Sequence, residues 1–277
     1  MRSGVRIQSP LETCAYLPQR ASRMLYDYVL ELQPAEYEVL LREGWRRFGR
    51  VVFRPNCPGC WACQSLRVRV REFQPDRSQR RTWRANAGKV RVEIGVPSLT
   101  REKLDLYDRH HSFRSETRGW MPQPAGDAAA YVNTFVRNPF PTQEWCYYLG
   151  QRLVGVGYVD RLPQALSAIY FFYDPDMRRL GLGTFNILQM IAYAAQAEIP
   201  YVYLGYYVAG CKSLAYKANF CPNEILYPDG AWRMFRTRRV ADSPPLSLPM
   251  WQEKDAGSHS SCPQDDKESC QDQVQPA

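Results

Sequence analysis

The chain has 277 residues, of which 45% are hydrophobic and 13% aromatic, a composition that excludes a disordered protein and allows one large or two smaller globular domains. The formal charge is +8, but residues 241–277 are acidic, so the rest of the chain holds 34 basic against 21 acidic residues. This basic body favours a polyanionic partner such as nucleic acid, although many basic proteins bind none.

The apolar segments and the number of cysteines indicate the cellular compartment. No apolar run is long enough to span a membrane, and the N-terminus lacks the hydrophobic core of a signal peptide, so we expect a cytoplasmic protein without membrane contact. Nine cysteines are an odd number for a disulfide framework, and they favour metal binding or reduced thiols.

The N-terminal region predicts an extended arm over residues 1–20, a strand or sheet edge over residues 23–32, and an amphipathic helix over residues 35–48 that Pro34 starts. Three cysteines spaced by two follow, and three such thiolates can converge on one soft metal or iron–sulfur cluster. The candidate metal ligands are Cys57, Cys60 and Cys63, with Cys14 as the fourth. The alternative is that these thiols are small buried side chains on a tight turn.

A basic run follows the cysteines. Residues 66–71 alternate apolar residues and arginines, which predicts a strand with one row of guanidinium groups, and residues 76–86 continue the run. Arginine pairs with phosphate and tryptophan stacks on bases, as in the binding of single-stranded or end-exposed RNA, so the candidate RNA-binding residues here are Arg80, Arg81, Trp83 and Arg84. The alternative is a solvated helix face.

The middle of the chain predicts a strand over residues 90–96 and a helix over residues 101–111, and we expect a second domain to begin at residue 98. His110 and His111 are neighbours on that helix, where adjacent side chains point apart, so a structural role is favoured for both. Residues 119–129 form a loop long enough to be functional.

A hairpin over residues 145–160 leads into a βαβ unit: a strand over residues 165–173, a helix, and a strand over residues 201–208 that should run parallel to the first. The helix carries a polar stripe of Asn186, Gln189, Tyr193 and Gln196 and buries its other sides. Arg178, Gly181 and Gly183 precede it, and glycines at a helix start favour a bound phosphate. Their spacing resembles the pyrophosphate loop of GCN5-related N-acetyltransferases.

The expected fold is α+β. Residues 98–240 form an acetyltransferase-like (GCN5-related) domain with a mixed sheet, residues 1–97 a smaller cysteine-containing α/β domain, and residues 241–277 a disordered acidic tail.

Several motifs, in order over residues 12–236, together resemble the aminoacyl-tRNA–protein transferases, and most of all the bacterial aspartate/glutamate leucyltransferases. They are the cysteine run, Ser78–Asn86, Ser167–Tyr170, Phe172–Pro175, Tyr203–Tyr206 and Tyr216–Ala218. Leu214 departs from the expected methionine, a change that conserves volume.

The resemblance implies transfer of leucine from leucyl-tRNA to the N-terminal α-amine of proteins that begin with Asp or Glu, which marks them for degradation. Its partners would be aminoacyl-tRNA and those proteins. Iron–sulfur binding is proposed for the family's N-terminal cysteines, so a cluster or zinc is expected there, and no coenzyme A. The alternatives are arginyl-tRNA as donor, a coenzyme-A-dependent N-acetyltransferase, and a non-catalytic RNA-binding protein.

Site residues also follow from the resemblance. In acetyltransferase-like folds the acyl carbonyl enters between the two parallel strands, which implies that Tyr170, Phe172 and Tyr206 lie near it. Tyr216 or Asp174 would relay a proton, and Lys217 or a nearby arginine would pair with the acceptor's carboxylate. The alternative is that the aromatic residues belong to the core.

Overall fold

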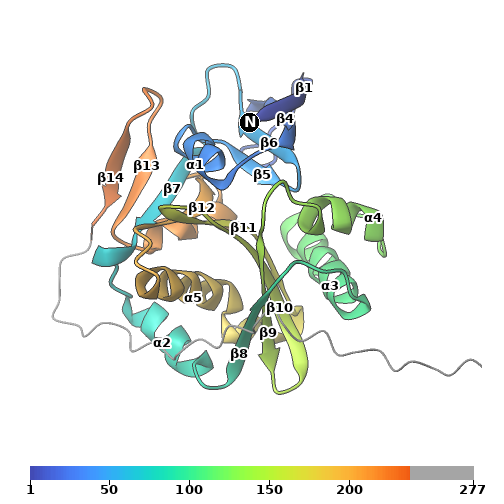
Figure 1. The fold of residues 1–277 in the computed structure, drawn as a ribbon, viewed down its shortest axis with the longest axis vertical. Helices are drawn as coiled ribbons and strands as arrows, with labels where there is room; N and C mark the ends of the chain where they lie inside the picture. Colours follow the sequence, from blue (N-terminus) through green and yellow to red (C-terminus); the bar gives the residue numbers. More distant parts are fainter. Residues whose placement is uncertain (238–277) are drawn as a thin grey trace, which may run out of the picture.

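The computed structural model describes residues 1–237 and shows an α+β fold built on one large mixed sheet (Figure 1). The eight strands of this sheet run in the order β14-β13-β7-β12-β11-β10-β9-β8. They are β7 (Gln64–Arg69), β8 (Val90–Gly95), β9 (Gln143–Leu149), β10 (Arg152–Arg161), β11 (Ala165–Tyr173), β12 (Tyr201–Tyr207), β13 (Asn223–Leu226) and β14 (Trp232–Arg236).

A smaller sheet of order β1-β4-β6-β5 lies at one end of the large one (Figure 1). Its strands are β1 (Arg2–Gln8), β4 (Met24–Glu31), β5 (Arg46–Phe48) and β6 (Val51–Pro55), and β2 (Glu12–Thr13) pairs separately with β3 (Ala21–Ser22). The predicted arm over residues 1–20 is therefore partly a sheet edge. The predicted helix over residues 35–48 ends early, because Gly44 turns the chain at φ +87° and β5 follows.

Helices cover both faces of the large sheet, with α2 and α5 on one side and α3 on the other (Figure 1). The helices are α1 (Pro34–Arg42), α2 (Arg77–Asn86), α3 (Arg101–Arg118), α4 (Ala128–Tyr131), α5 (Leu182–Gln196) and α6 (Lys212–Ala215). Short helical turns are η1 (Val70–Glu72), η2 (Val132–Val136), η3 (Pro175–Leu180) and η4 (Tyr216–Asn219). No helix within residues 1–237 is long and apolar enough to cross a membrane.

The predicted βαβ unit is confirmed: α5 connects β11 to β12, and these two strands are parallel. The predicted polar stripe of α5 is not on the surface, however, because it faces β9 of the large sheet, where Tyr193 packs on Trp145. Asn186 is buried and accepts a hydrogen bond of 2.7 Å from the Tyr147 hydroxyl, and Gln189 and Tyr193 are buried as well. Only Gln196 of the stripe is exposed.

The predicted domain boundary at residues 97 and 98 does not separate two folding units. Strands β7 and β8, which precede it, belong to the large sheet, and Trp83 of α2 shares a core with Phe185 of α5. Residues 1–55 form the small sheet and its helix instead. The expected tail, residues 241–277, lies outside the described residues.

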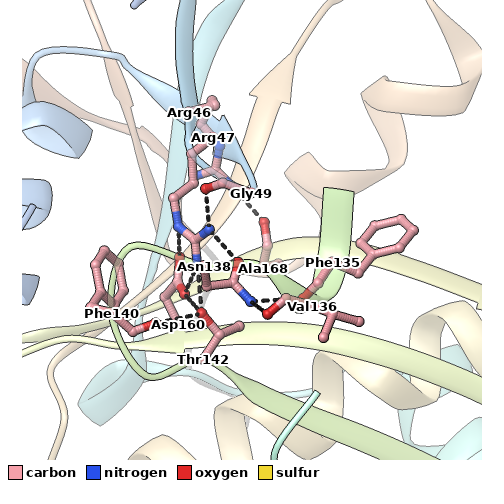
Figure 2. Close-up of polar contacts among 10 residues, drawn as sticks. All are labelled: Arg46, Arg47, Gly49, Phe135, Val136, Asn138, Phe140, Thr142, Asp160 and Ala168. Carbon is pink, nitrogen blue, oxygen red and sulfur yellow. Dashed lines mark hydrogen bonds and ion pairs between the residues drawn. The ribbon is translucent and has the colours of Figure 1, made fainter. Parts of the chain in front are cut away.

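Arg47 of β5 fastens the small sheet to the large one (Figure 2). Its guanidinium is fully buried, donates through Nε to Asp160 Oδ2 at 2.8 Å, and forms a second bond with Asp160 Oδ1. The remaining donors reach the Gly49 carbonyl, Asn138 Oδ1 at 2.8 Å and Thr142 Oγ1 at 2.6 Å. Because every donor is satisfied, the buried charge is tolerated, and β5 is held at a fixed position beside β10 and β11.

Candidate active site

A gap opens between β11 and β12 after only three paired positions, Ala165↔Tyr201 to Ser167↔Tyr203. One residue later, the carbonyl of Ala168 accepts a hydrogen bond from Arg46 Nη2 of β5. On the facing strand, Gly205 has φ +83° and interrupts the regular pairing with β7. The two parallel strands therefore part at this point, and a guanidinium lies beside them.

Lys217 faces the same gap from η4. Its Nζ lies 3.4 Å from the point that a Cβ on Gly205 would occupy, and Nη2 of Arg46 lies 3.6 Å from that point. Lys217 Nζ also donates to the Tyr206 carbonyl at 2.9 Å. Burial, and next the Arg46 charge, lower the pKa of Lys217 to about 7. We call Arg46 and Lys217 the inner cation pair.

Tyr170 and His111 form a second polar pair at this gap. The Tyr170 hydroxyl lies 2.9 Å from His111 Nε2, and the His111 ring packs on Tyr107 with centroids 4.2 Å apart. Burial raises the pKa of Tyr170 and lowers the pKa of His111, so the imidazole is neutral at pH 7 and can accept a proton. Phe48, two residues after Arg46, contacts Tyr170.

His110, by contrast, has the structural role that the sequence favours. It is 1% exposed, its Nδ1 lies 2.9 Å from the Tyr173 carbonyl, and Arg114 donates to its Nε2. The Tyr173 N–H lies 3.2 Å from the same Nδ1, so both ring nitrogens have partners within the fold.

Asp174 is ion-paired and does not fit the predicted proton relay. Its carboxylate is fully buried and bound by Arg109, at 3.2 Å, and by Arg152. Although burial raises it, hydrogen bonds from the Asp176 N–H and from both arginines hold the pKa of Asp174 below its usual range. A carboxylate held in its charged form by two guanidinium groups is a poor base, so Asp174 instead fixes the end of β11.

The two other tyrosines predicted at the site differ in position. Tyr206 is buried and its hydroxyl donates to the Gly44 carbonyl at 2.9 Å, so it joins β12 to the small sheet and its hydroxyl is not directed at a substrate. Tyr216 is 40% exposed beside Lys217 and stays a candidate. Phe172 is completely buried in the core on the α3 side.

The glycine loop lies at the end of β11, as predicted. Gly181 adopts φ +65° and caps α5, a conformation that favours glycine, and the first turn of the helix leaves its N–H groups free for an anion. Gly183 has open space around its Cα, and Arg178 is exposed nearby. Helix α2 touches this loop: Asn86 Nδ2 donates to the Leu180 carbonyl at 2.8 Å.

Helix α2 presents its arginines to solvent. A surface hollow of about 810 Å³ is lined by Arg77, Ser78, Arg80, Arg81 and Arg84. Trp83 is the exception among the predicted residues, because it is 5% exposed and packs on Phe185 with centroids 5.6 Å apart. The predicted stacking of Trp83 on a base is therefore wrong, and Trp83 is a core residue that anchors α2.

The row of arginines on β7 is also not a free phosphate surface. Arg67 Nε is paired with Glu224 at 2.7 Å, and its guanidinium lies over the rings of Tyr201 and Trp232. Arg69 is paired with Glu72 and Glu224. Strand β7 is an interior strand of the sheet, where unpaired guanidinium groups would be costly.

The four predicted metal-ligating cysteines are free, partly buried thiols near one another. Burial, and then the neighbouring thiols of Cys14, Cys57, Cys60 and Cys211, raise the pKa of Cys63 to about 12. The Arg23 N–H and the Arg20 guanidinium donate to the sulfurs of Cys57 and Cys60. Among residues 1–237 no three His, Cys, Asp or Glu side chains are arranged to hold a metal ion, so metal binding stays a prediction.

Three site residues carried little signal in the sequence. Arg46 stands next to Arg47 in an otherwise apolar stretch, and only the fold shows that one is an anchor and the other faces the gap. The sequence favours a structural role for His111, and only its contact with the Tyr170 hydroxyl identifies it as a candidate site residue. Cys211 lies apart from the cysteine run in sequence.

Family models match most of the chain. The model "Arginine-tRNA-protein transferase, N terminus" matches residues 12–81, and "Arginine-tRNA-protein transferase, C terminus" matches residues 102–227. The chain belongs to this family and is an aminoacyl-tRNA–protein transferase. The resemblance inferred from the motifs is thereby confirmed.

Individual relatives carry a more specific name. The aspartate/glutamate leucyltransferase of Campylobacter jejuni (strain RM1221) is 38% identical over 218 residues, which are 78% of this chain and 90% of the relative. The protein of the same name from Halorhodospira halophila is 40% identical over 225 residues, 79% of this chain and 92% of the relative. The crystal structure of FemX covers 67% of this chain and 75% of its own, with 8% identity and a TM-score of 0.41, a likeness too small to define the fold.

Proposed function

We propose that this chain transfers leucine from leucyl-tRNA to the N-terminal α-amine of cytoplasmic proteins that begin with Asp or Glu. Relatives that share 38% and 40% of their residues with it over nine-tenths of their own length are named for these substrates. We also propose an acetyltransferase-like (GCN5-related) arrangement, because a glycine loop joins two parallel strands that separate after three pairs.

The donor site rests on one observation: the glycine loop contacts α2, the helix that carries exposed arginines. Thr82 of α2 lies 3.4 Å from the point that a Cβ on Gly181 would occupy, and Arg81 and Arg84 are exposed on the same helix. Phosphates near the 3′ end of a tRNA would meet the free N–H groups of α5, while the arginines would bind the strand further along. Coenzyme A would bind the loop through its pyrophosphate but would not need the arginines of α2.

The transfer step needs no covalent intermediate, because the aminoacyl ester is already activated. The acceptor's α-amine attacks the ester carbonyl, the C–O bond to the tRNA breaks, the departing ribose oxygen takes up a proton from water, and the amine loses a proton. Tyr170 would accept that proton while passing its own to neutral His111, which is hydrogen-bonded to its hydroxyl. Tyr216 would border the same space from η4.

The experiment mixes the purified protein with labelled leucyl-tRNA or arginyl-tRNA and with peptides beginning Asp, Glu or Ala. Label from leucyl-tRNA should enter the Asp and Glu peptides only. Equal labelling of the Ala peptide would remove the acceptor rule, and preference for arginyl-tRNA would reassign the donor.

Acetyl-coenzyme A tests the main alternative in the same assay. We expect that it neither donates an acetyl group nor raises the melting temperature, whereas leucyl-tRNA does raise it. A clear stabilisation by micromolar acetyl-coenzyme A, with none by leucyl-tRNA, would favour an N-acetyltransferase.

A further inference from the structure

The inner cation pair has the chemistry of an anion-binding site. Arg46 is 6% exposed, and its Nη1 is buried without a hydrogen-bond partner. Nε and Nη2 of Arg46 and Nζ of Lys217 all lie within 3.4–3.7 Å of one point, the position that a side chain on Gly205 would fill. Because Gly205 has no side chain, both positive groups lie against the same point of β12.

The cations are not explained by ion pairing within the fold. Arg47, the neighbouring residue, is equally buried but has Asp160 as its partner, whereas no ion pair within residues 1–237 includes Arg46 or Lys217. Burying two positive groups side by side costs free energy, and the lowered pKa of Lys217 is the response to that cost. A carboxylate bound between the two groups would favour the charged form of Lys217, and such perturbed groups are typical of functional sites.

The donor does not supply this anion. Ala168, which binds Arg46, is five residues before Tyr173, so the end of β11 is about 16 Å away at about 3.3 Å per strand residue, and the glycine loop lies beyond that end. A donor phosphate at the loop cannot reach the pair. The aminoacyl end that would enter the gap carries no negative charge, because the leucine carboxyl is esterified and its amine is neutral or cationic.

We propose that Arg46 and Lys217 bind the side-chain carboxylate of the acceptor's N-terminal residue and so restrict the acceptor to Asp and Glu. The inference rests on the proposed function and assigns its specificity site. The guanidinium offers Nη1 for a charge-assisted hydrogen bond and the ammonium adds a second positive charge. Phe48 connects this site to Tyr170, so an acceptor held by its carboxylate has its α-amine near the proton relay.

The test compares matched peptides that begin with Asp or with the isosteric Asn, and likewise Glu or Gln, with leucyl-tRNA as donor. In Arg46→Gln and in Lys217→Met, kcat/KM for the acidic peptides should fall about a hundredfold or more, as for other truncated buried charge contacts, while the rate with the amide peptides changes little. The acid-over-amide preference should therefore collapse. Lys212→Met, an exposed lysine on α6, is the matched control and should keep the preference.

Three further measurements separate a lost acceptor contact from a folding defect and from a lost tRNA contact. Circular dichroism and the affinity for leucyl-tRNA should stay unchanged in the variants, and the Asp peptide alone should raise the melting temperature of the parent protein but not of Arg46→Gln. Arg46→Lys, which keeps the charge and loses the second nitrogen, should retain part of the preference and serves if Arg46→Gln does not fold.

A folded Arg46→Gln protein that still prefers Asp to Asn would overturn the inference. So would a loss of tRNA affinity with an unchanged acceptor preference, since the pair would then bind a phosphate. If the parent protein transfers no leucine to any peptide, the proposed function fails, while binding of the Asp peptide still reports on the site separately.

Discussion

His110 and His111 are adjacent in sequence and have opposite uses, which burial and hydrogen bonding decide. His111 is paired with a tyrosine hydroxyl at the gap, while both ring nitrogens of His110 are used within the fold. Burial chiefly lowers the pKa of His110 to about 4, from an ordinary value of 6.5. The neutral ring is therefore part of the folded state over a pH range in which an unfolded chain would carry the charge.

This shift makes stability depend on pH. Below pH 6.5 the unfolded chain takes up a proton at His110 and the folded protein does not, so stability is lost as the pH falls toward 4. The free energy of unfolding of the parent protein, relative to His110→Asn, should fall by about 3 kcal/mol between pH 7 and pH 4. Urea unfolding at several pH values measures it. A difference that stays constant with pH would contradict the shift.

Helix α2 shows that one element can serve both the core and a ligand. Trp83 holds the helix against α5, and the arginines on its outer side line the surface hollow. The sequence predicted the basic run correctly but placed Trp83 on the wrong side, because a tryptophan among arginines has the same local pattern whether it stacks on a base or on a core.

Arg81→Ala and Arg84→Ala should each weaken binding of charged and uncharged tRNA alike and reduce the slope of log K against log salt by about one, the value for one lost phosphate contact. Titration by fluorescence anisotropy at several salt concentrations measures the slope. Arg118→Ala, an exposed arginine at the end of α3, is the control and should leave it unchanged. An unchanged slope in both α2 variants would move the tRNA site elsewhere.

The two glycines of the loop have different roles: Gly181 is needed for folding and Gly183 for the close approach of phosphate. Gly181 has φ +65°, so Gly181→Ala should cost about 1–2 kcal/mol of stability. Gly183 has no such conformation and open space around it, so Gly183→Val should fold and keep much of its tRNA affinity while blocking the close approach of phosphate. Transfer should fall at least tenfold in Gly183→Val at unchanged melting temperature. Full activity would show that nothing approaches the loop closely.

Features set by a local sequence pattern could be predicted from the sequence, and features set by contacts between distant segments could not. The βαβ unit and its glycine loop were predictable, because strand, turn and helix signals lie within one stretch of chain. The buried stripe of α5 and the membership of β7 and β8 in the large sheet depend on pairing between distant segments. The role of Arg46 depends on a contact with Ala168, 122 residues away, which no local pattern reveals.

At the scale of the assembled fold, the cysteines lie beside the active site and not in a separate module. Cys211 lies near both Cys63 and Lys217, so the cysteines adjoin the inner cation pair. A metal or cluster at Cys14, Cys57, Cys60 and Cys63 would draw the arm at residues 14–17 and the cysteine run together next to the gap, with hydrogen bonds from Arg20 and Arg23 to the sulfurs.

Metal analysis after anaerobic purification tests this prediction. We expect iron with acid-labile sulfide, or zinc, in the parent protein and its loss in Cys57→Ser and Cys63→Ser. Cys146→Ser, a buried thiol in β9, should keep the metal. Metal-free protein that is folded and fully active would show that the cysteines are free thiols without a metal-binding role.

The anchor formed by Arg47 has a consequence for insertions and deletions. Adjacent residues of a strand point to opposite faces. A slip of β5 by one position would therefore bring Arg47, now bound to Asp160, to the gap, and Arg46 would lose its place there. Gly49 closes off that movement, because a Cβ at this position would lie 2.0 Å from the Asn133 carbonyl. A chain-length change between α1 and β6 would therefore disturb the Arg47 anchor and the position of Arg46 together, although it leaves α2 and the glycine loop unchanged.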